Sequence, residues 1–297
     1  MKRPSIIVVG ALVLAALAPG QTAAARRPTA PPSRVLQDHF VVGQRYTYHL
    51  HDDETEKGQA TGQAPVAQEY TIDGPLTYTV SSVDAAGMAT GLMRADLTIV
   101  TLNNGGAVSS MKQEPPNFPA HRVLLYPDGR IVDLTADIYP VNSVAGARDP
   151  LHAYGLQSYG PLLTRAVAAD QPWTSSYSVP VTTTVGGILL DAPASPWTKL
   201  GRTVVTGYGM DGSRPVASLA STLTSHYAAE ALYHGQPVAM TYVESNTIVS
   251  SFDLGYARLR SSSVKSSSAM SATVTGAGKS VAIALRTSGR ETLTATP

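Results

Sequence analysis

The chain has no cysteine, only three phenylalanines and two tryptophans, and few charged residues. Without cysteine it has no disulfide framework, no thiolate metal site and no nucleophilic thiol. Its formal charge of +1 offers no basic patch for nucleic acid. A charged fraction of 14% beside 43% hydrophobic residues excludes a polyelectrolyte-type disordered chain. At 297 residues the chain is long enough to bury a core without disulfides.

The N-terminal residues have the order of a secretory signal peptide. Met1–Arg3 is basic, Ile6–Leu17 is apolar, and Ala23–Ala25 supplies small residues for cleavage. The apolar run is too short for an ordinary membrane span. We therefore expect residues 1–25 to be removed, which changes the formal charge from +1 to −1. No cysteine follows to carry a lipid, so we expect an exported protein with no stable membrane anchor.

The rest of the chain divides into a tether and one domain. Arg26–Gln37 contains three prolines and is typical of an extended tether. From Asp38 to Pro297 hydrophobic residues mostly alternate with polar ones, as in Arg45–His51 and Leu76–Val83. This period of two predicts half-buried strands. The other predicted strands are Leu92–Leu102, Arg122–Tyr126, Arg130–Leu134, Thr203–Tyr208, Pro215–Thr224, Val238–Phe252, Tyr256–Ser268 and Val281–Leu293.

Turn residues separate these strands. Asn103–Gly106, Pro127–Gly129 and Met210–Ser213 are typical of tight turns, and the polar segment Asp52–Ala64 is expected to be a loop. Long strands joined by tight turns predict an all-β, mainly antiparallel fold. Its expected form is a curved, unclosed half-barrel in meander order, and a β-sandwich is the alternative.

One segment, Asp149–Ala168, has helical spacing instead. Asp149-Pro150 is typical of a helix start, and leucines and tyrosines follow every three to four residues. Gly160-Pro161 divides the stretch, so we expect two short helices. Because helices in an all-β domain need an apolar surface to cover, we expect them over the concave face of the sheet.

Nucleotide and hydrolase motifs fail in this sequence. Gly276–Ser280 ends like a phosphate loop, but Thr273 stands where the first glycine is required. Ser262–Lys265 matches Ser-x-x-Lys, yet lies in a serine-rich strand without the accompanying motifs. No linear pattern assembles a nucleophile, a base and oxyanion donors, so a hydrolase ranks last. We expect no enzymatic activity and no cofactor.

The histidines have the spacings closest to those of a metal site. His49 and His51 share one strand face, but a zinc ion would need further ligands from elsewhere. The favoured interpretation is a polar strand end. His226, Glu230 and His234 would align on a helix, whereas the alternation running into them indicates a strand. Their convergence stays open, and no metal is expected.

Several segments together resemble the bacterial lipoprotein-carrier superfamily typified by LolA and its lipid-binding relatives. They are Gly43–Tyr48, the Tyr126–Arg130 hairpin, Gln171–Trp173 and Phe252–Gly255. The resemblance implies an unclosed half-barrel whose helices cover a site for acyl chains. The chain departs from it in lacking a lipidated cysteine and in the Gly/Pro-rich stretch Thr182–Trp197.

The function expected from this resemblance is non-catalytic binding of a lipid or other apolar small molecule outside the cytoplasm. The candidate ligand-binding residues are Tyr154, Tyr159, Leu162 and Leu163, all on the expected helices. An envelope-associated structural or interaction protein with a filled core is the alternative. The oligomeric state is left open.

Overall fold

The computed structural model describes residues 33–103, 108–113, 120–133, 161–179, 184–185, 188–189, 197–233, 235–276 and 279–296. These residues lie within one compact unit, Pro32–Pro297. They form strands and turns but no helix, so none of them belongs to a helix long and apolar enough to span a membrane.

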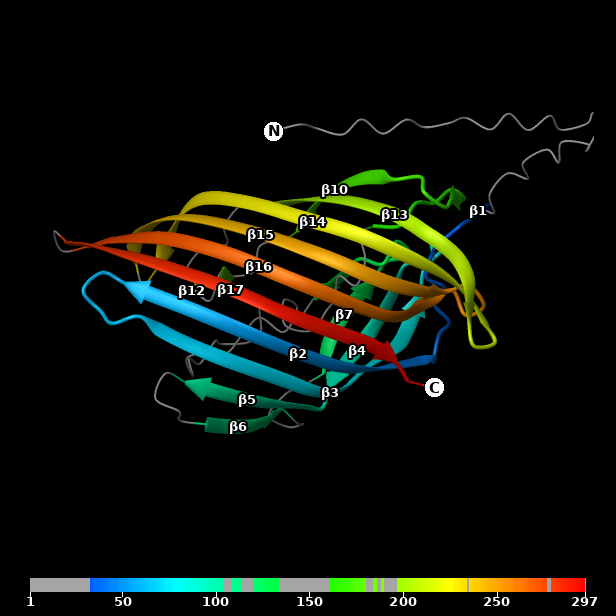
Figure 1. Ribbon diagram of the computed structural model, residues 1–297, viewed down its shortest axis with the longest axis horizontal. Helices are drawn as coiled ribbons and strands as arrows, with labels where there is room; N and C mark the ends of the chain where they lie inside the picture. The colour runs from blue at the N-terminus through cyan, green and yellow to red at the C-terminus, as the bar shows by residue number, and fades with distance from the viewer. Residues whose placement is uncertain are drawn as a thin grey trace, which may run out of the picture. The chain divides into compact units, whose positions relative to one another are not determined.

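Thirteen strands form one antiparallel sheet, and Figure 1 shows the long ones side by side. Its main path runs β10-β13-β14-β15-β16-β17-β2-β3-β4-β7-β8, with β5 and β6 branching from β3. The strands are β2 (Arg45–Ala60), β3 (Val66–Val83), β4 (Ala89–Ala95), β5 (Leu97–Asn103), β6 (Val108–Gln113), β7 (His121–Leu125), β8 (Ile131–Asp133), β10 (Trp173–Val179), β13 (Trp197–Asp211), β14 (Arg214–Tyr233), β15 (Gln236–Asp253), β16 (Arg258–Gly276) and β17 (Lys279–Ala295). Two small pairs accompany it: β1 (Ser33–Arg34) with β9 (Val167–Ala168), and β11 (Thr184–Val185) with β12 (Ile188–Leu189).

The all-β, antiparallel prediction is confirmed. From β13 to β17 every strand pairs with its successor in the chain, which is the meander that tight turns favour. β17 then pairs with β2, so the last long strand lies beside the first. Within the described ranges the pairing does not close, because β10 and β8 end the path.

The predicted turns at Pro127–Gly129 and Met210–Ser213 are confirmed. Tyr126 and Arg130 are linked by a backbone hydrogen bond of 2.8 Å, and Gly129 adopts the positive φ that a glycine tolerates. Asp211 pairs with Arg214 across the second turn. At Asn103–Gly106 the flanking strands β5 and β6 pair antiparallel, while the turn itself lies outside the described residues.

Two strand predictions are wrong in detail. The expected loop Asp52–Ala64 is strand as far as Ala60, because β2 continues along β17 and β3. The single strand expected at Leu92–Leu102 is two strands, β4 and β5, which meet at Asp96. There β3 changes its partner from β5 to β4, and the Asp96 amide donates to the Pro75 carbonyl at 3.0 Å.

The predicted helices over the sheet are not formed at residues 161–168. The chain there is extended, and its hydrogen bonds go to distant segments instead of to the preceding turn. The Leu162 amide donates to the Asp128 carbonyl at 2.9 Å, and the Trp173 indole donates to the Pro161 carbonyl at 2.9 Å. Residues 149–160 of the expected helices lie outside the described residues.

The long strands give the sheet a buried face and an open face. Alternate side chains of β2, β3 and β14–β17 form the hydrophobic core, with Leu50, Leu76, Leu219 and Phe252 almost fully buried. The intervening side chains are mainly serine, threonine and charged residues and form the open face. Buried and open side chains alternate along most of β15 and the first half of β2, as a half-buried sheet requires.

Candidate functional site

The candidate site is a pocket near one end of the sheet, which we call the tyrosine pocket. It lies among the start of β2, the end of β3, the β7–β8 turn and the start of β16, and its volume is about 60 Å³. A single water molecule needs about 10–15 Å³ of such a cavity. The pocket therefore has room for about four to six waters, or for the part of a ligand that replaces them. Its walls are formed mainly by Tyr46, Tyr48, Tyr78, Leu125, Ile131 and Leu293.

The three tyrosines point inward because they occupy alternate positions on paired strands. Tyr46 lies opposite Tyr78 in the β2–β3 register, and Tyr48 is two residues further along β2. The Tyr48 and Tyr78 rings meet edge to face with centroids 6.1 Å apart, a preferred aromatic geometry. Burial raises the pKa of both phenols above their ordinary value, so both hydroxyls stay protonated and neutral at neutral pH.

The segment before β2 closes one side of the pocket. Backbone hydrogen bonds join Asp38 to Pro127 at 2.7 Å and His39 to Ala257 at 2.9 Å. Phe40 packs edge-on against Tyr46, whose hydroxyl donates to the His39 carbonyl at 3.0 Å. These contacts hold the segment across the β7–β8 turn and the start of β16.

Two arginines reach the pocket in different electrostatic settings. The Arg130 guanidinium stacks over Tyr126 at 4.5 Å and pairs with Asp128 at 2.8 Å. Arg258 lies 5.4 Å from the ring centroid of Tyr46 and 5.2 Å from that of Tyr256. Within the described part of the chain, no carboxylate forms an ion pair with Arg258. Arg258 is therefore a cation that lies against two tyrosine rings at the wall of the pocket.

The turn before β16 sets the position of Arg258. Asp253 accepts hydrogen bonds from the Gly255 and Tyr256 amides at 2.9 and 3.0 Å, and its other oxygen lies 3.5 Å from Arg214. Ala257 then adopts a φ of +48° and reverses the chain into β16. The sequence fragment Phe252–Gly255 thus builds the bend that returns Arg258 to the pocket.

The pocket lining contains aromatic, aliphatic and arginine side chains together with the carboxyl group of Asp38. In the described part of the lining there is no serine, cysteine, histidine or lysine. Its chemistry is suited to binding a ligand.

No protein family and no curated protein matches the chain. Among solved structures it is similar to OccK7 (OpdD) of Pseudomonas aeruginosa, with 8% identity, 86% of this chain and 100% of that chain covered, and a TM-score of 0.25. It is also similar to a loop-deletion mutant of OmpT, an outer membrane protein of Vibrio cholerae, with 10% identity, coverage of 86% and 100%, and a TM-score of 0.19. A mutant porin of Rh. blastica shares 7% identity, with coverage of 85% and 100% and a TM-score of 0.18. Likenesses this distant assign neither a family nor an activity.

These comparisons correct the resemblance to lipoprotein carriers. None of the three structures named above is a LolA-like carrier, and two of them are an outer membrane protein and a porin, so the carrier assignment is wrong. The expectation of a secreted, lipid-binding protein with no stable membrane anchor is wrong on the same finding, whereas the unclosed antiparallel sheet is as expected.

The buried face gives a physical reason against an acyl-chain site. A band of polar side chains, the polar belt, crosses it between apolar rows, and each member is less than a tenth exposed. The belt comprises Asp52, Glu54, Lys199, Ser225, Glu244, Asn246 and Glu291. An acyl chain along this face would contact buried carboxylates, whose desolvation is costly. A lipid or other apolar ligand on the sheet is therefore the wrong prediction.

Of the four predicted ligand-binding residues, Leu162 and Leu163 lie in the described ranges, and neither lines the tyrosine pocket. Leu162 is 4% exposed and belongs to the hydrophobic core, and Leu163 is partly buried against the same core. Tyr154 and Tyr159 lie outside the described residues. The tyrosine pocket was missed, although three of the quoted sequence fragments flank it: Gly43–Tyr48, Tyr126–Arg130 and Phe252–Gly255. Alternation placed these fragments on strands and turns, but only the strand pairing brings them together.

The histidine predictions have a mixed outcome. His226 and Glu230 lie on strand β14, so the helix that would align them is absent, and His234 lies outside the described residues. His49 and His51 share the open face of β2, as expected, and both contact Asp73 of β3. Over the described ranges no group of three or more His, Cys, Asp or Glu residues is arranged to hold a metal ion.

Proposed function

We propose that the protein is a non-catalytic binding protein for a small organic anion, held in the tyrosine pocket with its acidic group on Arg258. The observation that carries the proposal is the Arg258 guanidinium, which lies against the rings of Tyr46 and Tyr256 at the wall of an aromatic pocket and forms no ion pair with a carboxylate of the described residues. This ligand differs from the rejected lipid in charge, in size and in place.

The pocket selects the ligand by shape and by charge. Aromatic walls favour a planar ring, which can stack on or meet the tyrosines edge to face. A guanidinium presents paired N–H donors that match a carboxylate. The Arg130 charge is already compensated by Asp128, so Arg258 is the group to which an anion binds, although the Asp38 carboxyl in the same lining opposes this attraction. A monocarboxylate on a six-membered ring fits these features.

The first test compares benzoate with neutral benzamide, which has nearly the same shape. We expect Arg258→Gln to weaken benzoate binding about 10–100-fold, since a hydrogen bond to a charged group contributes about 1.5–3 kcal/mol and 1.4 kcal/mol is tenfold. Benzamide binding should change little. Isothermal titration calorimetry or a chemical-shift titration of the full chain measures both.

Arg260→Gln is the matched control, because Arg260 lies two residues further along β16 and pairs with Asp211 away from the pocket. It should leave benzoate affinity unchanged. The proposal fails if the unmodified protein binds neither probe, or if Arg258→Gln weakens benzamide as much as benzoate.

The proposed site of action is outside the cytoplasm, reached by a cleaved signal peptide. The basic, apolar and small-residue order of residues 1–25 supports export. We expect mass spectrometry of the exported protein to show a mature N-terminus at Arg26. Exported protein that retains Met1 would contradict cleavage.

A further inference from the structure

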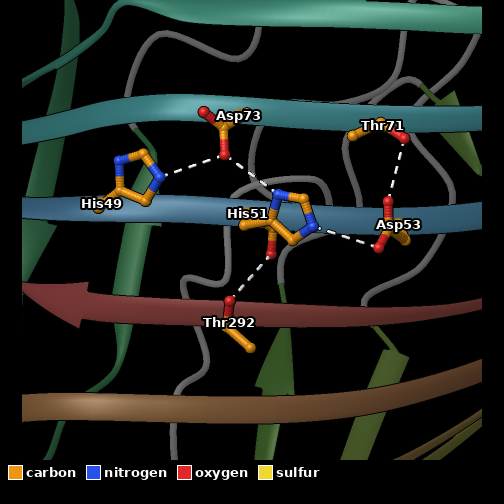
Figure 2. A network of polar contacts seen from close by, with 6 residues as sticks. All are labelled: His49, His51, Asp53, Thr71, Asp73 and Thr292. Carbon is orange, nitrogen blue, oxygen red and sulfur yellow. Dashed lines mark hydrogen bonds and ion pairs between the residues drawn. The ribbon is translucent and has the colours of Figure 1, made fainter.

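Two histidines and two carboxylates form a connected cluster on the open face, where β2 pairs with β3. The His51 Nδ1 lies 3.0 Å from Asp73 Oδ1, and the His49 Nε2 lies 3.1 Å from the same oxygen. The other ring nitrogen of His51 lies 3.2 Å from Asp53 Oδ2. Figure 2 shows the His51 ring between the two carboxylates, with Asp73 reaching across from the neighbouring strand.

Strand register places these groups together. His51 is the direct cross-strand partner of Asp73, and His49 is two residues away on the same face of β2. Both nitrogens of His51 face a carboxylate oxygen, and both can donate only when the imidazole is protonated. The protonated His51 ring can therefore donate to Asp73 and Asp53 at the same time. The neutral ring has one N–H group and can donate to only one of them.

The neighbouring strands supply few competing charges. On the β17 side Thr292 is the direct partner of His51, and its hydroxyl donates to the His51 carbonyl at 3.5 Å. Arg290 of β17 lies opposite Asp53. On the far side of β3 the strand partner of Asp73 is the uncharged Thr98 of β5, whose own partner on β6 is Lys112. Thr71 donates to Asp53 at 3.0 Å and holds that carboxylate toward His51.

The protonation equilibria follow this geometry. The hydrogen bond with Asp73 raises the pKa of His51 above its ordinary value; burial opposes this and the contact with Asp53 adds to it. At Asp73 burial raises the pKa, but the contacts with His51 and His49 outweigh it and hold the pKa below its usual range. The two shifts are the two sides of one interaction between an imidazolium and a carboxylate.

We propose that His49, His51, Asp53 and Asp73, the histidine brace, are a proton-controlled link between β2 and β3 that is closed in mildly acidic solution and released in alkaline solution. The sign follows from linkage: a group whose pKa is higher in the folded state stabilises the fold below its unfolded value and loses that contribution as pH rises through the folded value. The carboxylate sets the acid limit, because its contribution is lost as pH falls through the lowered pKa of Asp73. The brace therefore contributes its full stabilisation between about pH 4 and about pH 6.5, the ordinary values for the two side chains, and it opens only beyond the folded pKa values, which lie outside this window.

The direct test is an NMR titration of the histidine rings in the full chain, with EDTA present to exclude metal binding. We expect His51 to titrate above its ordinary value of about 6.5. In Asp73→Asn the pKa of His51 should fall back toward that value, whereas Asp53→Asn should lower it less. A His51 that titrates at or below 6.5 in the unmodified protein overturns the proposal without any variant.

The thermodynamic test follows the melting temperature of the unmodified protein and of His51→Gln from pH 5.5 to 8.5. The deficit of His51→Gln should be largest at pH 5.5 and shrink as pH rises through the folded pKa of His51. His226→Gln is the control, because His226 is exposed on the open face of β14 and forms no hydrogen bond or ion pair with the described residues. Its melting difference should not depend on pH. A deficit of His51→Gln that stays constant across the range would show that the ring acts only by packing.

Discussion

Replacing Gly74 by alanine is expected to destabilise the protein by at least about 3 kcal/mol, combining the strain of an unfavourable φ with displacement of the backbone. Gly74 has a φ of +146°, and a Cβ there would lie 2.3 Å from the Asp96 carbonyl oxygen and 3.1 Å from the Leu97 Cα. Both obstacles are backbone atoms, so no side-chain rotation relieves the contact. In a domain of this size the melting temperature should fall by roughly 6–12 °C.

The reason for this glycine lies in the sheet topology. β3 pairs with β5 up to Asp73 and with β4 from Leu76 onward, so the chain between β4 and β5 passes over Gly74 and Pro75. The main chain at Asp96 therefore approaches β3 closely, and only a residue without a Cβ leaves room for it.

Gly58→Ala is the matched control for this prediction. Gly58 also lies in a long strand, but its φ is ordinary, and a Cβ there would lie 3.5 Å from a side-chain atom of Leu285. Since glycine in a strand interior costs about 0.5–1 kcal/mol relative to alanine, this variant should be neutral or slightly stabilised. Equal denaturant midpoints for the two variants would show that the close approach at Gly74 carries no strain.

The sequence predicted the strands best where hydrophobic residues alternate with polar ones. In the first half of β2 and along most of β15 the apolar residues at alternate positions enter the core, while Val243 and Val249 of β15 lie on the open face. The second half of β2 has no such alternation, because Asp52 and Glu54 occupy the buried positions. Its polarity favoured a loop, and only pairing with β17 on one side and β3 on the other explains why it is a strand.

The helix prediction was wrong over residues 161–168 for a different reason. Leucine and tyrosine at intervals of three to four residues fit one face of a helix, but hydrogen bonds to the β7–β8 turn and to Trp173 hold this segment extended. Long-range contacts of this kind override local propensity. The tyrosine pocket is equally long-range, since Tyr46, Arg130 and Arg258 are far apart in the sequence.

The second large effect is expected in the polar belt, where Lys199 and Glu244 form a buried ion pair. Lys199 Nζ lies 3.2 Å from Glu244 Oε2, and the two side chains are 7% and 10% exposed. Ser225 donates to the same carboxylate at 3.1 Å and Asn246 donates at 2.7 Å. All four belong to three neighbouring strands, β13, β14 and β15, so the pair fixes their alignment over the buried face.

Lys199→Met should cost about 2–4 kcal/mol, because removing one partner leaves a buried charge uncompensated. The Ser225 hydroxyl and the Asn246 amide still donate to Glu244 in this variant, and Glu244 has further interactions. The loss of stability should therefore stay below the largest values seen when a buried ion pair is broken. Glu244→Gln should cost a similar amount by leaving the Lys199 ammonium facing a neutral amide. Chemical denaturation at pH 7 measures both.

The decisive variant is the combination of Lys199→Met with Glu244→Gln. Since the double variant contains neither charge, we expect it to be more stable than the sum of the single losses predicts, with a coupling energy of about 1–3 kcal/mol. The exposed pair Arg260–Asp211, with side chains 26% and 55% exposed, is the comparison, and the same cycle there should couple by about 1 kcal/mol or less. Raising the salt from 0.05 to 0.5 M should abolish the exposed coupling and leave most of the buried one, since buried charges are screened less. Strictly additive single losses at Lys199 and Glu244 would mean that the two charges contribute separately, through their other neighbours in the belt, and that their contact does not hold β13 in register with β15.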